Sequence, residues 1–295
     1  MEHLNESAKQ ILLLNDNKRI EDISNSKWIG YPRAKKVLNK LEDLLEHPTI
    51  LRMPNLLLVG DTNNGKTVLV NRFYTMHRPV INISDSKLVA KVIYVQAPSL
   101  PDERKFYNAL LERLQVPYNL SDKVEKKQQQ VFSVLKRIGT RILIIDEIHH
   151  VLAGTSAKQR MFLNVIKYLA NELQIVIVAV GIRDAFNAIN TDAQLANRFE
   201  PELLPKWEMN EEYLRLLASY ECMLPLKKPS NLIDTDIALK ILSLSEGTIG
   251  EISKVLSLAS VEAIKSKKEF IDKSIIHKID YIPPSDRRKY ANKLG

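Results

Sequence analysis

The segment 60–67, Gly-Asp-Thr-Asn-Asn-Gly-Lys-Thr, has the residue types that hold the phosphates of a nucleotide. Its glycines let the backbone fold around a phosphate, its lysine can neutralise phosphate charge, and its last threonine offers a hydroxyl to Mg²⁺. A surface turn that matches by chance is the alternative. Because an apolar strand pattern precedes the segment and a helical pattern follows it, we expect a nucleotide-binding loop formed by Gly60, Asp61, Thr62, Asn63, Asn64, Gly65, Lys66, Thr67 and Val68.

Two adjacent carboxylates form a second candidate group. The apolar run 142–145 ends in Asp146 and Glu147, and open parallel sheets place their ligand chemistry at the carboxyl ends of strands. Asp146 would position Mg²⁺ together with Thr67, while Glu147 would orient the water that attacks the γ-phosphate. An acidic helix cap would explain Asp146 alone, but not easily the pair. The expected cofactors are therefore ATP and Mg²⁺, and the expected reaction is ATP hydrolysis.

Alternating strand and helix patterns must position these groups. Buried strands are expected at 56–59, 92–95, 142–145 and 175–180, and helices at 6–15, 33–46, 68–74, 102–114, 122–138 and 158–172. Such alternation predicts an α/β fold with a parallel sheet that helices cover on both faces.

The pattern changes after residue 201. Prolines separate helical patterns at 211–223, 236–245 and 250–265, and no strand of comparable strength follows, which predicts a small all-helical domain. The expected order is an N-terminal helical extension at 1–27, a nucleotide-binding α/β domain at 28–207, a helical lid at 208–278 and a basic, proline-containing tail at 279–295. We expect this tail to be flexible or docked on a partner.

Composition limits the class of protein. With 295 residues, of which 45% are hydrophobic, the chain can bury one sizeable core and a smaller satellite domain. The net charge of +8 favours a polyanionic partner, although lysine runs such as 126–127 are expected to be solvated helix faces. A single cysteine and the lack of a secretory or membrane-spanning pattern predict a cytoplasmic protein without a membrane partner.

Taken together, these features resemble AAA+ ATPases. The resemblance rests on the phosphate-binding loop, the strand that ends in Asp-Glu, the helical lid and the segment 195–199, Leu-Ala-Asn-Arg-Phe, before a last short strand. The phrases at 28–32, 52–55 and 60–67, with further stretches at 175–181 and 194–199, are similar to the TniB family and its TnsC relatives. The resemblance spans most of the chain, from residue 28 into the lid.

Membership of that family would imply a regulator of DNA transposition. The implied partners are double-stranded DNA, further copies of the chain in an ATP-dependent ring or filament, a transposase and a target-selection protein. ATP would lie between neighbouring subunits, and Arg198 matches the arginine that reaches the γ-phosphate of the next subunit. The alternatives are that Arg198 caps a helix or pairs with Glu200.

Other site residues follow from the same comparison. Trp28 and Ile29 stand where related proteins pack the adenine, although core packing would explain Trp28 equally well. In TnsC-like assemblies two loops face the central channel, and the resemblance implies that the matching residues here contact DNA: Arg104, Lys105, Ser121 and Lys123. The alternative is that these residues are solvated helix starts. Such contacts would be largely independent of DNA sequence and sensitive to salt.

Two departures from the AAA+ pattern are visible. The strand at 175–180 is followed by Gly181, Ile182 and Arg183, where a polar sensor of the γ-phosphate is usual, with Arg183 a weak substitute. In the lid, Gly250 stands in place of a sensor arginine. Both departures would suit slow hydrolysis that acts as a timer.

Alternative functions remain at this stage. A AAA+ motor, such as a helicase loader or protein remodeller, would normally carry an aromatic pore loop, which 96–103 lacks. In a metabolite kinase Glu147 would serve the acceptor, but the helical lid and the basic charge argue against it. The adjacent pair His149 and His150 is not expected to bind a metal, because neighbouring helical residues do not share a face.

Overall fold

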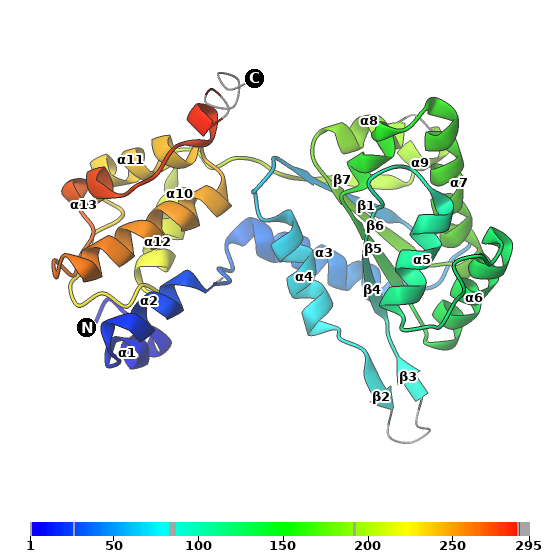
Figure 1. The fold of residues 1–295 in the computed structure, drawn as a ribbon, viewed down its shortest axis with the longest axis horizontal. Coiled ribbons are helices and arrows are strands. Elements are labelled where there is room, and N and C mark those ends of the chain that lie inside the picture. The colour runs from blue at the N-terminus through cyan, green and yellow to red at the C-terminus, as the bar shows by residue number, and fades with distance from the viewer. Residues whose placement is uncertain (1, 26, 83–86, 191–192, 288, 290–295) are drawn as a thin grey trace. The chain divides into compact units, whose positions relative to one another are not determined.

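A computed structural model describes residues 2–25, 27–82, 87–190, 193–287 and 289, in two compact units (Figure 1). The first unit contains residues 34–204, and the second combines residues 1–33 with residues 205–295. We call them the α/β unit and the helical unit. Among the described residues, no helix is both long and apolar enough to cross a membrane.

A five-stranded parallel sheet forms the centre of the α/β unit. Its strand order is β4-β5-β6-β1-β7, with β1 at Asn55–Gly60, β4 at Val92–Gln96, β5 at Ile142–Asp146, β6 at Val176–Gly181 and β7 at Phe199–Leu204. Every residue of β1, β5 and β6 is buried, as continuous apolar runs require when a sheet is covered on both faces. The carboxyl ends of these strands meet at one edge of the sheet, where the register pairs Val59 with Gly181 and Gln96 with Asp146.

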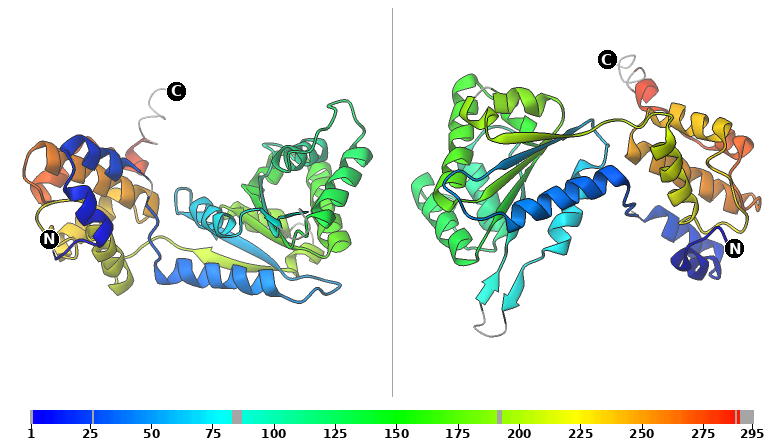
Figure 2. Two further views of the ribbon diagram at one scale, coloured as in Figure 1. Left: turned by 90° about the horizontal axis from the view of Figure 1, so that it is seen from below. Right: turned by 180° about the vertical axis from the view of Figure 1, so that it is seen from behind.

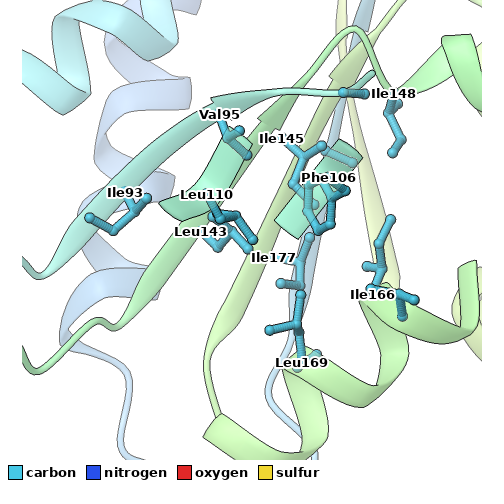
Figure 3. Close-up of a cluster of buried hydrophobic side chains, with 14 of the residues drawn as sticks. Ile93, Val95, Phe106, Leu110, Leu143, Ile145, Ile148, Ile166, Leu169 and Ile177 are labelled. Atoms are coloured by element: carbon cyan, nitrogen blue, oxygen red, sulfur yellow. The ribbon is translucent and has the colours of Figure 1, made fainter. Parts of the chain in front are cut away.

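Helices pack on both faces of the sheet. The helices of the α/β unit are α3 at Pro32–Glu46, α4 at Lys66–Met76, α5 at Glu103–Arg113, α6 at Val124–Arg137, α7 at Ser156–Leu173, α8 at Asp184–Asn190 and α9 at Ala193–Ala196, with a 3-10 helix, η1, at Ile148–Ala153. Alternate strand residues such as Leu143, Ile145 and Ile177 share one buried cluster with α5, α6 and α7 (Figure 3). The intervening residues Leu56 and Ile144 are also fully buried, on the opposite face.

The sheet edge at β7 is lined by α3. Lys40 of α3 pairs with Glu200 at 2.5 Å and with Glu202 at 3.4 Å, so α3 lies beside β7 (Figure 2). Helix α4 packs on the sheet face opposite to the one that α5, α6 and α7 cover, and it contacts β1, β4 and β6. The strands β1, β4, β5 and β6 and the helices α3 to α7 agree with the predicted ranges to within a few residues, whereas α8, α9 and η1 were not predicted.

An exposed hairpin, by contrast, is absent from the sequence-based prediction. Strands β2 at Val80–Asn82 and β3 at Lys87–Val89 pair antiparallel between α4 and β4 and project from the α/β unit (Figure 1). Val80, Ile81 and Leu88 are largely exposed on it. A three-residue strand is too short to produce a clear alternation, and neither of the described strands of the hairpin contributes a residue to the large core cluster of the α/β unit.

The helical unit joins the two ends of the chain. It contains α1 at Glu6–Leu12, α2 at Asp16–Ser24, α10 at Glu211–Glu221, α11 at Thr235–Ser245, α12 at Ile249–Lys265 and α13 at Lys273–Lys278. The N-terminal helices, which the sequence analysis treated as a separate extension, pack against the C-terminal ones. The guanidinium of Arg19 is buried, donates to the Pro225 carbonyl and forms an ion pair with Glu269 at 2.5 Å.

The described part of the basic tail is docked on the helical unit. Arg287 donates to both carboxylate oxygens of Glu251, at 3.1 and 2.7 Å. The hydroxyl of Tyr281 donates to the same carboxylate at 2.6 Å, and the Ser285 amide donates to Glu246. Residues 281–287 therefore have a fixed position against α12 and the turn before it.

Candidate nucleotide site

The phosphate-binding loop connects the end of β1 to the start of α4. Gly65 has a φ of 82°, in the left-handed region that favours glycine. A Cβ atom on Gly60 would lie 2.8 Å from the Leu204 carbonyl oxygen, so the close approach of β7 also requires glycine there. The buried side-chain amide of Asn64 donates to that same carbonyl at 2.7 Å. The loop is thus held in shape by β7 as well as by its own backbone.

Lys66 is only 6% exposed, although it carries a charge. Its ammonium donates to the carbonyl oxygens of Gly60 at 2.9 Å and Asp61 at 2.8 Å, so it lies inside the curve of the loop. Burial lowers the pKa of Lys66, while the carboxylates of Glu147, Asp146 and Asp61 act in the opposite direction. Phosphate oxygens are better acceptors for this ammonium than neutral carbonyls, because they are charged.

Thr67 and Asp146 meet at the carboxyl edge of the sheet. The Thr67 hydroxyl donates to Asp146 Oδ2 at 2.8 Å, and the Tyr94 hydroxyl donates to the same oxygen at 2.9 Å. Burial and the adjacent Asp146 carboxylate raise the pKa of Tyr94, which keeps its hydroxyl protonated as a donor. One hydroxyl and one carboxylate oxygen side by side fit Mg²⁺, which takes few protein ligands and keeps several waters.

Glu147 directs its carboxylate differently from Asp146. Its φ is 56°, a left-handed conformation that costs a residue with a side chain roughly 1–3 kcal/mol. Its amide donates to Asp146 Oδ1 at 2.8 Å, and its Oε2 lies 3.2 Å from Nδ1 of His149. The sharp turn separates the two carboxylates, so that Asp146 contacts Thr67 while Glu147 points to a different position.

The histidines beside Glu147 lie closer to it than their sequence positions suggest. Potential ligand atoms of Glu147, His149 and His150 lie within 4.8 Å of one another because η1 is a tight 3-10 turn. Burial lowers the pKa of His149, which favours the neutral imidazole, and the Glu147 carboxylate acts in the opposite direction. The expectation that no metal other than Mg²⁺ binds here stays a prediction.

No polar side chain occupies the tip of β6. A Cβ atom on Gly181 would lie 2.8 Å from the Ala185 side chain and 3.4 Å from His149 Nδ1, so a larger residue has no space there. Arg183 Nε lies 3.5 Å from Asp61 Oδ1, but 84% of the Arg183 side chain is exposed to solvent. Of the three side chains closest to this position, the polar one is the imidazole of His149, for which the sequence predicts no role.

Arg198 lies at the opposite edge of the sheet from this site. Its carbonyl accepts the amide of Asn55 at the start of β1, and its guanidinium donates to Asn171 of α7 at 2.6 Å. Glu200, the ion-pair partner considered from the sequence, instead pairs with Lys40. Because β1 has six residues, about 20 Å separates Arg198 from the phosphate-binding loop of the same chain.

The candidate DNA residues lie at two helix starts. Arg104 and Lys105 are exposed in the first turn of α5, and Ser121 and Lys123 are exposed before α6. Lys127 corrects the expectation of a solvated lysine run, because it is fully buried. Its ammonium donates to Asn108 of α5 at 2.8 Å and to the Leu120 carbonyl at 3.2 Å, which fixes the loop before α6 against α5.

Trp28 and Ile29 belong to the helical unit. Ile29 is buried in its core, and Trp28 is partly buried. The neighbouring Tyr31 packs edge-on against Trp207, with the ring centres 5.1 Å apart. A contact of Trp28 or Ile29 with adenine stays a prediction.

Comparisons with known proteins give a family match and a curated relative. A family model described as "Bacterial TniB protein" matches residues 19–209. The chain is also 27% identical over 154 residues to the ATP-dependent Clp protease ATP-binding subunit ClpL of Lactococcus lactis subsp. lactis. That match covers 50% of this chain and 18% of ClpL, so the chain spans less than a fifth of the length of this relative.

Solved structures resemble the chain in fold. The ORC2 protein of Aeropyrum pernix superposes with a TM-score of 0.62 at 13% identity, over 88% of this chain and 71% of that one. The Aeropyrum pernix ORC1 protein in complex with DNA gives 0.56 at 15% identity, over 92% and 69%. AMPPCP-bound DnaA from Aquifex aeolicus gives 0.52 at 16% identity, over 90% and 69%. At these identities the likeness shows the fold alone, which is the AAA+ fold, and the predicted fold class is confirmed.

Proposed function

The chain belongs to the TniB family, and on that premise we propose that it is an ATP-dependent regulator of DNA transposition that assembles on duplex DNA. Family and fold together make it an AAA+ ATPase. In the proposed role it selects the target site on duplex DNA and recruits or activates the transposase of the same element. ATP hydrolysis then releases the assembly, so the nucleotide acts as a switch.

The nucleotide chemistry is assigned to four residues. Lys66 neutralises the β- and γ-phosphate charge, and Thr67 with Asp146 holds the Mg²⁺ that ATP brings, which would polarise the phosphate oxygens. Glu147 orients the attacking water and accepts its proton. The 2.8 Å contact between the Thr67 hydroxyl and Asp146, with Glu147 turned away from it, is the observation that carries this assignment.

Assembly is assigned to Arg198 of one copy and the ATP of the next. The distance along β1 excludes a contact between Arg198 and the nucleotide of its own chain. A guanidinium supplied by a neighbour makes ATP a bridge between two copies, and loss of the γ-phosphate removes charge from that bridge.

DNA binding is assigned to exposed residues at the starts of α5 and α6, which are the cations Arg104, Lys105 and Lys123 and the hydroxyl of Ser121. The net charge of +8 supports a polyanionic partner. The same fold in the Aeropyrum pernix ORC1 structure is described in complex with DNA, so the fold is compatible with this role. Contacts of this kind involve phosphates and not base edges.

The test is nucleotide-dependent binding to a labelled duplex, measured by fluorescence anisotropy over a range of salt concentrations. The wild-type protein should bind tightly with a non-hydrolysable ATP analogue and weakly with ADP. Lys66→Ala should lose the nucleotide effect, and Arg104→Ala with Lys105→Ala should reduce the slope of log affinity against log salt by about 2, one for each lost phosphate contact. Equal DNA affinity with the analogue, ADP and no nucleotide would contradict the proposal.

A protein-remodelling motor is the second candidate function, and the similarity to ClpL favours it. Such a motor normally grips its substrate with an aromatic pore loop. The segment 97–102 after β4 has no aromatic residue, and its exposed apolar side chain is Leu100. ATP-driven unfolding of a tagged model substrate without DNA would support the motor. No unfolding of that substrate, together with ATP hydrolysis that DNA stimulates, would support the regulator.

A further inference from the structure

A basic hollow lies at the edge of the α/β unit where β1 begins. Its volume is about 530 Å³, and its polar lining comes from His47, Arg52, Asn197 and Arg198, with Met53 and Pro54 beside them. No carboxylate is present among the described residues that line it. The hollow therefore combines two permanent positive charges without a neutralising partner of opposite sign in its wall.

The strand register brings the two arginines together. The Asn55 amide donates to the Arg198 carbonyl at 3.0 Å, and Asn55 pairs in register with Phe199. Arg52 precedes Asn55 by three residues, so both arginines lie at the amino end of the β1 and β7 pair. Arg52 is exposed and Arg198 is partly buried. The pairing of β1 with β7 thus brings the backbones that carry the two arginines to the same end of the sheet.

The segment that carries Arg52 is held at several points. Met53 is buried, and its sulfur accepts the Ile50 amide at 3.4 Å. Arg141 donates to the His47 carbonyl and to the Thr49 hydroxyl. Because the segment is held on both sides of Arg52, its backbone needs no ordering when a ligand binds, which lowers the entropy cost of binding.

The hollow suits an anion with several oxygens, because each guanidinium can bind two oxygens of one phosphate. The chain's own nucleotide cannot fill it, since the phosphate-binding loop lies at the other end of β1, about 20 Å away. The anion must come from a second molecule. In the proposed assembly, the triphosphate held by Lys66 and Thr67 of a neighbouring copy is that anion.

We propose that Arg52 acts together with Arg198 as a second arginine that each copy presents to the ATP of its neighbour. This inference rests on the proposed function and adds a residue to its shared site. Arg52 contacts the triphosphate in the assembled state, so it contributes to hydrolysis and to cohesion but not to nucleotide binding by a single copy. A lysine at this position would keep the charge and lose the bidentate geometry.

The test uses mixtures of defective variants on duplex DNA. Arg52→Ala alone should reduce ATP turnover at least about tenfold, because an arginine from a neighbour stabilises the transition state. Nucleotide affinity of the isolated chain should remain unchanged, and Arg52→Lys should restore only part of the turnover. Arg160→Ala, an exposed arginine of α7, serves as the control and should behave as the wild type.

Mixing locates the role of Arg52. Lys66→Ala cannot hold ATP but still presents both arginines, while Arg52→Ala holds ATP but lacks one of them. Lys66→Ala alone should be inactive, and Arg52→Ala alone should show the reduced turnover stated above. Their mixture should recover turnover if Arg52 acts on the neighbour's nucleotide. Arg198→Ala mixed with Lys66→Ala provides the same test for the first arginine, and recovery in both mixtures is the expected result.

The outcomes separate the two proposals. The role of Arg52 would be overturned if turnover recovered in the mixture with Arg198→Ala but not in the mixture with Arg52→Ala. Normal turnover by Arg52→Ala alone would overturn it too. Either result would leave the shared site intact. Failure of both mixtures would overturn the shared site itself, and with it the proposed assembly. A loss of DNA affinity in Arg52→Ala with unchanged turnover would identify a DNA phosphate as the ligand of the hollow and also overturn the inference.

Discussion

Glu147 and Asp146 are adjacent in the chain, yet their surroundings give them different chemistry. Asp146 is buried and accepts hydrogen bonds from Thr67 and Tyr94, whereas Glu147 is only partly buried and lies beside His149. A buried carboxylate held in place beside a hydroxyl suits a cation, and a partly exposed carboxylate suits a water.

Glu147→Gln should keep ATP binding and lower turnover by about 100-fold, because the amide cannot accept the proton of the attacking water. The protein should then stay on DNA in the ATP-bound state. Phosphate release measures the turnover, and dissociation from a labelled duplex measures how long the protein stays on DNA. Unchanged turnover would remove Glu147 from the reaction.

Arg198 has a partner within its own chain that it must leave in order to reach a neighbour. Its guanidinium donates to Asn171 at 2.6 Å. Asn171→Ala should therefore leave assembly intact or strengthen it, whereas Arg198→Ala should lower turnover by about 1,000-fold and abolish assembly. Sedimentation with a non-hydrolysable ATP analogue distinguishes the two. Equal loss of assembly in both variants would mean that the Asn171 contact is the structural role of Arg198.

Local sequence predicts the residues of the nucleotide site far better than their supporting contacts. The loop at 60–67 and the Asp-Glu pair follow from short motifs whose spacing their chemistry dictates. Tyr94 and His149 were missed because their roles depend on pairing between β4 and β5 and on the tight turn of η1. The buried Lys127 was missed because its acceptors belong to another helix and a loop.

Among the elements, the central strands were predictable and the hairpin was not. β1, β5 and β6 are uninterrupted apolar runs, because helices cover both of their faces. The strands β2 and β3 are short and exposed, so no burial pattern marks them. Periodicity reports burial, and an element outside the core leaves no such signal.

The loop before α6 depends on Lys127 for its position. Lys127→Met keeps the packing volume but leaves Asn108 and the Leu120 carbonyl without this donor, at a cost of about 1 kcal/mol for each lost hydrogen bond. The candidate DNA residues Ser121 and Lys123 would then lose their fixed position. DNA affinity should fall while ATP affinity of the isolated chain stays unchanged.

The adjacent lysine provides the matched control for that experiment. Lys126 is exposed and pairs with Asp122 at the surface, so Lys126→Met removes the same charge and leaves both hydrogen bonds of Lys127 in place. Its DNA affinity should fall much less than that of Lys127→Met. Equal effects of the two substitutions would show that charge alone matters and that the loop has no positioning role.

At the scale of the whole chain, the N-terminal and C-terminal segments fold together in the helical unit. Residues 1–27 were predicted to be a separate extension because no local pattern links Arg19 to Glu269, which are 250 positions apart. The buried ion pair makes that link, and it also holds the Pro225 carbonyl. A buried charge needs such partners, and breaking the pair by removing one of them is costly.

This pair makes the helical unit sensitive to acid. Although burial would raise the pKa of Glu269, its bonds to Arg19 and Lys227 lower it below the ordinary value. A carboxyl with a depressed pKa in the folded state stabilises the protein above its unfolded pKa, and that stability is lost as the pH falls through the folded value. Glu269→Gln should cost about 3 kcal/mol at neutral pH. Thermal melting should show the wild type losing stability below about pH 4.5, with a flatter profile for the variant.

The central claim is that ATP joins copies of the chain around duplex DNA. The direct measurement is the mass in solution of the purified protein with a short duplex and a non-hydrolysable ATP analogue, by analytical ultracentrifugation. We predict a complex of several copies per duplex that forms only when nucleotide and DNA are both present, and that Lys66→Ala and Arg198→Ala fail to form. A wild-type protein that remains a single copy under saturating nucleotide and DNA would contradict the account.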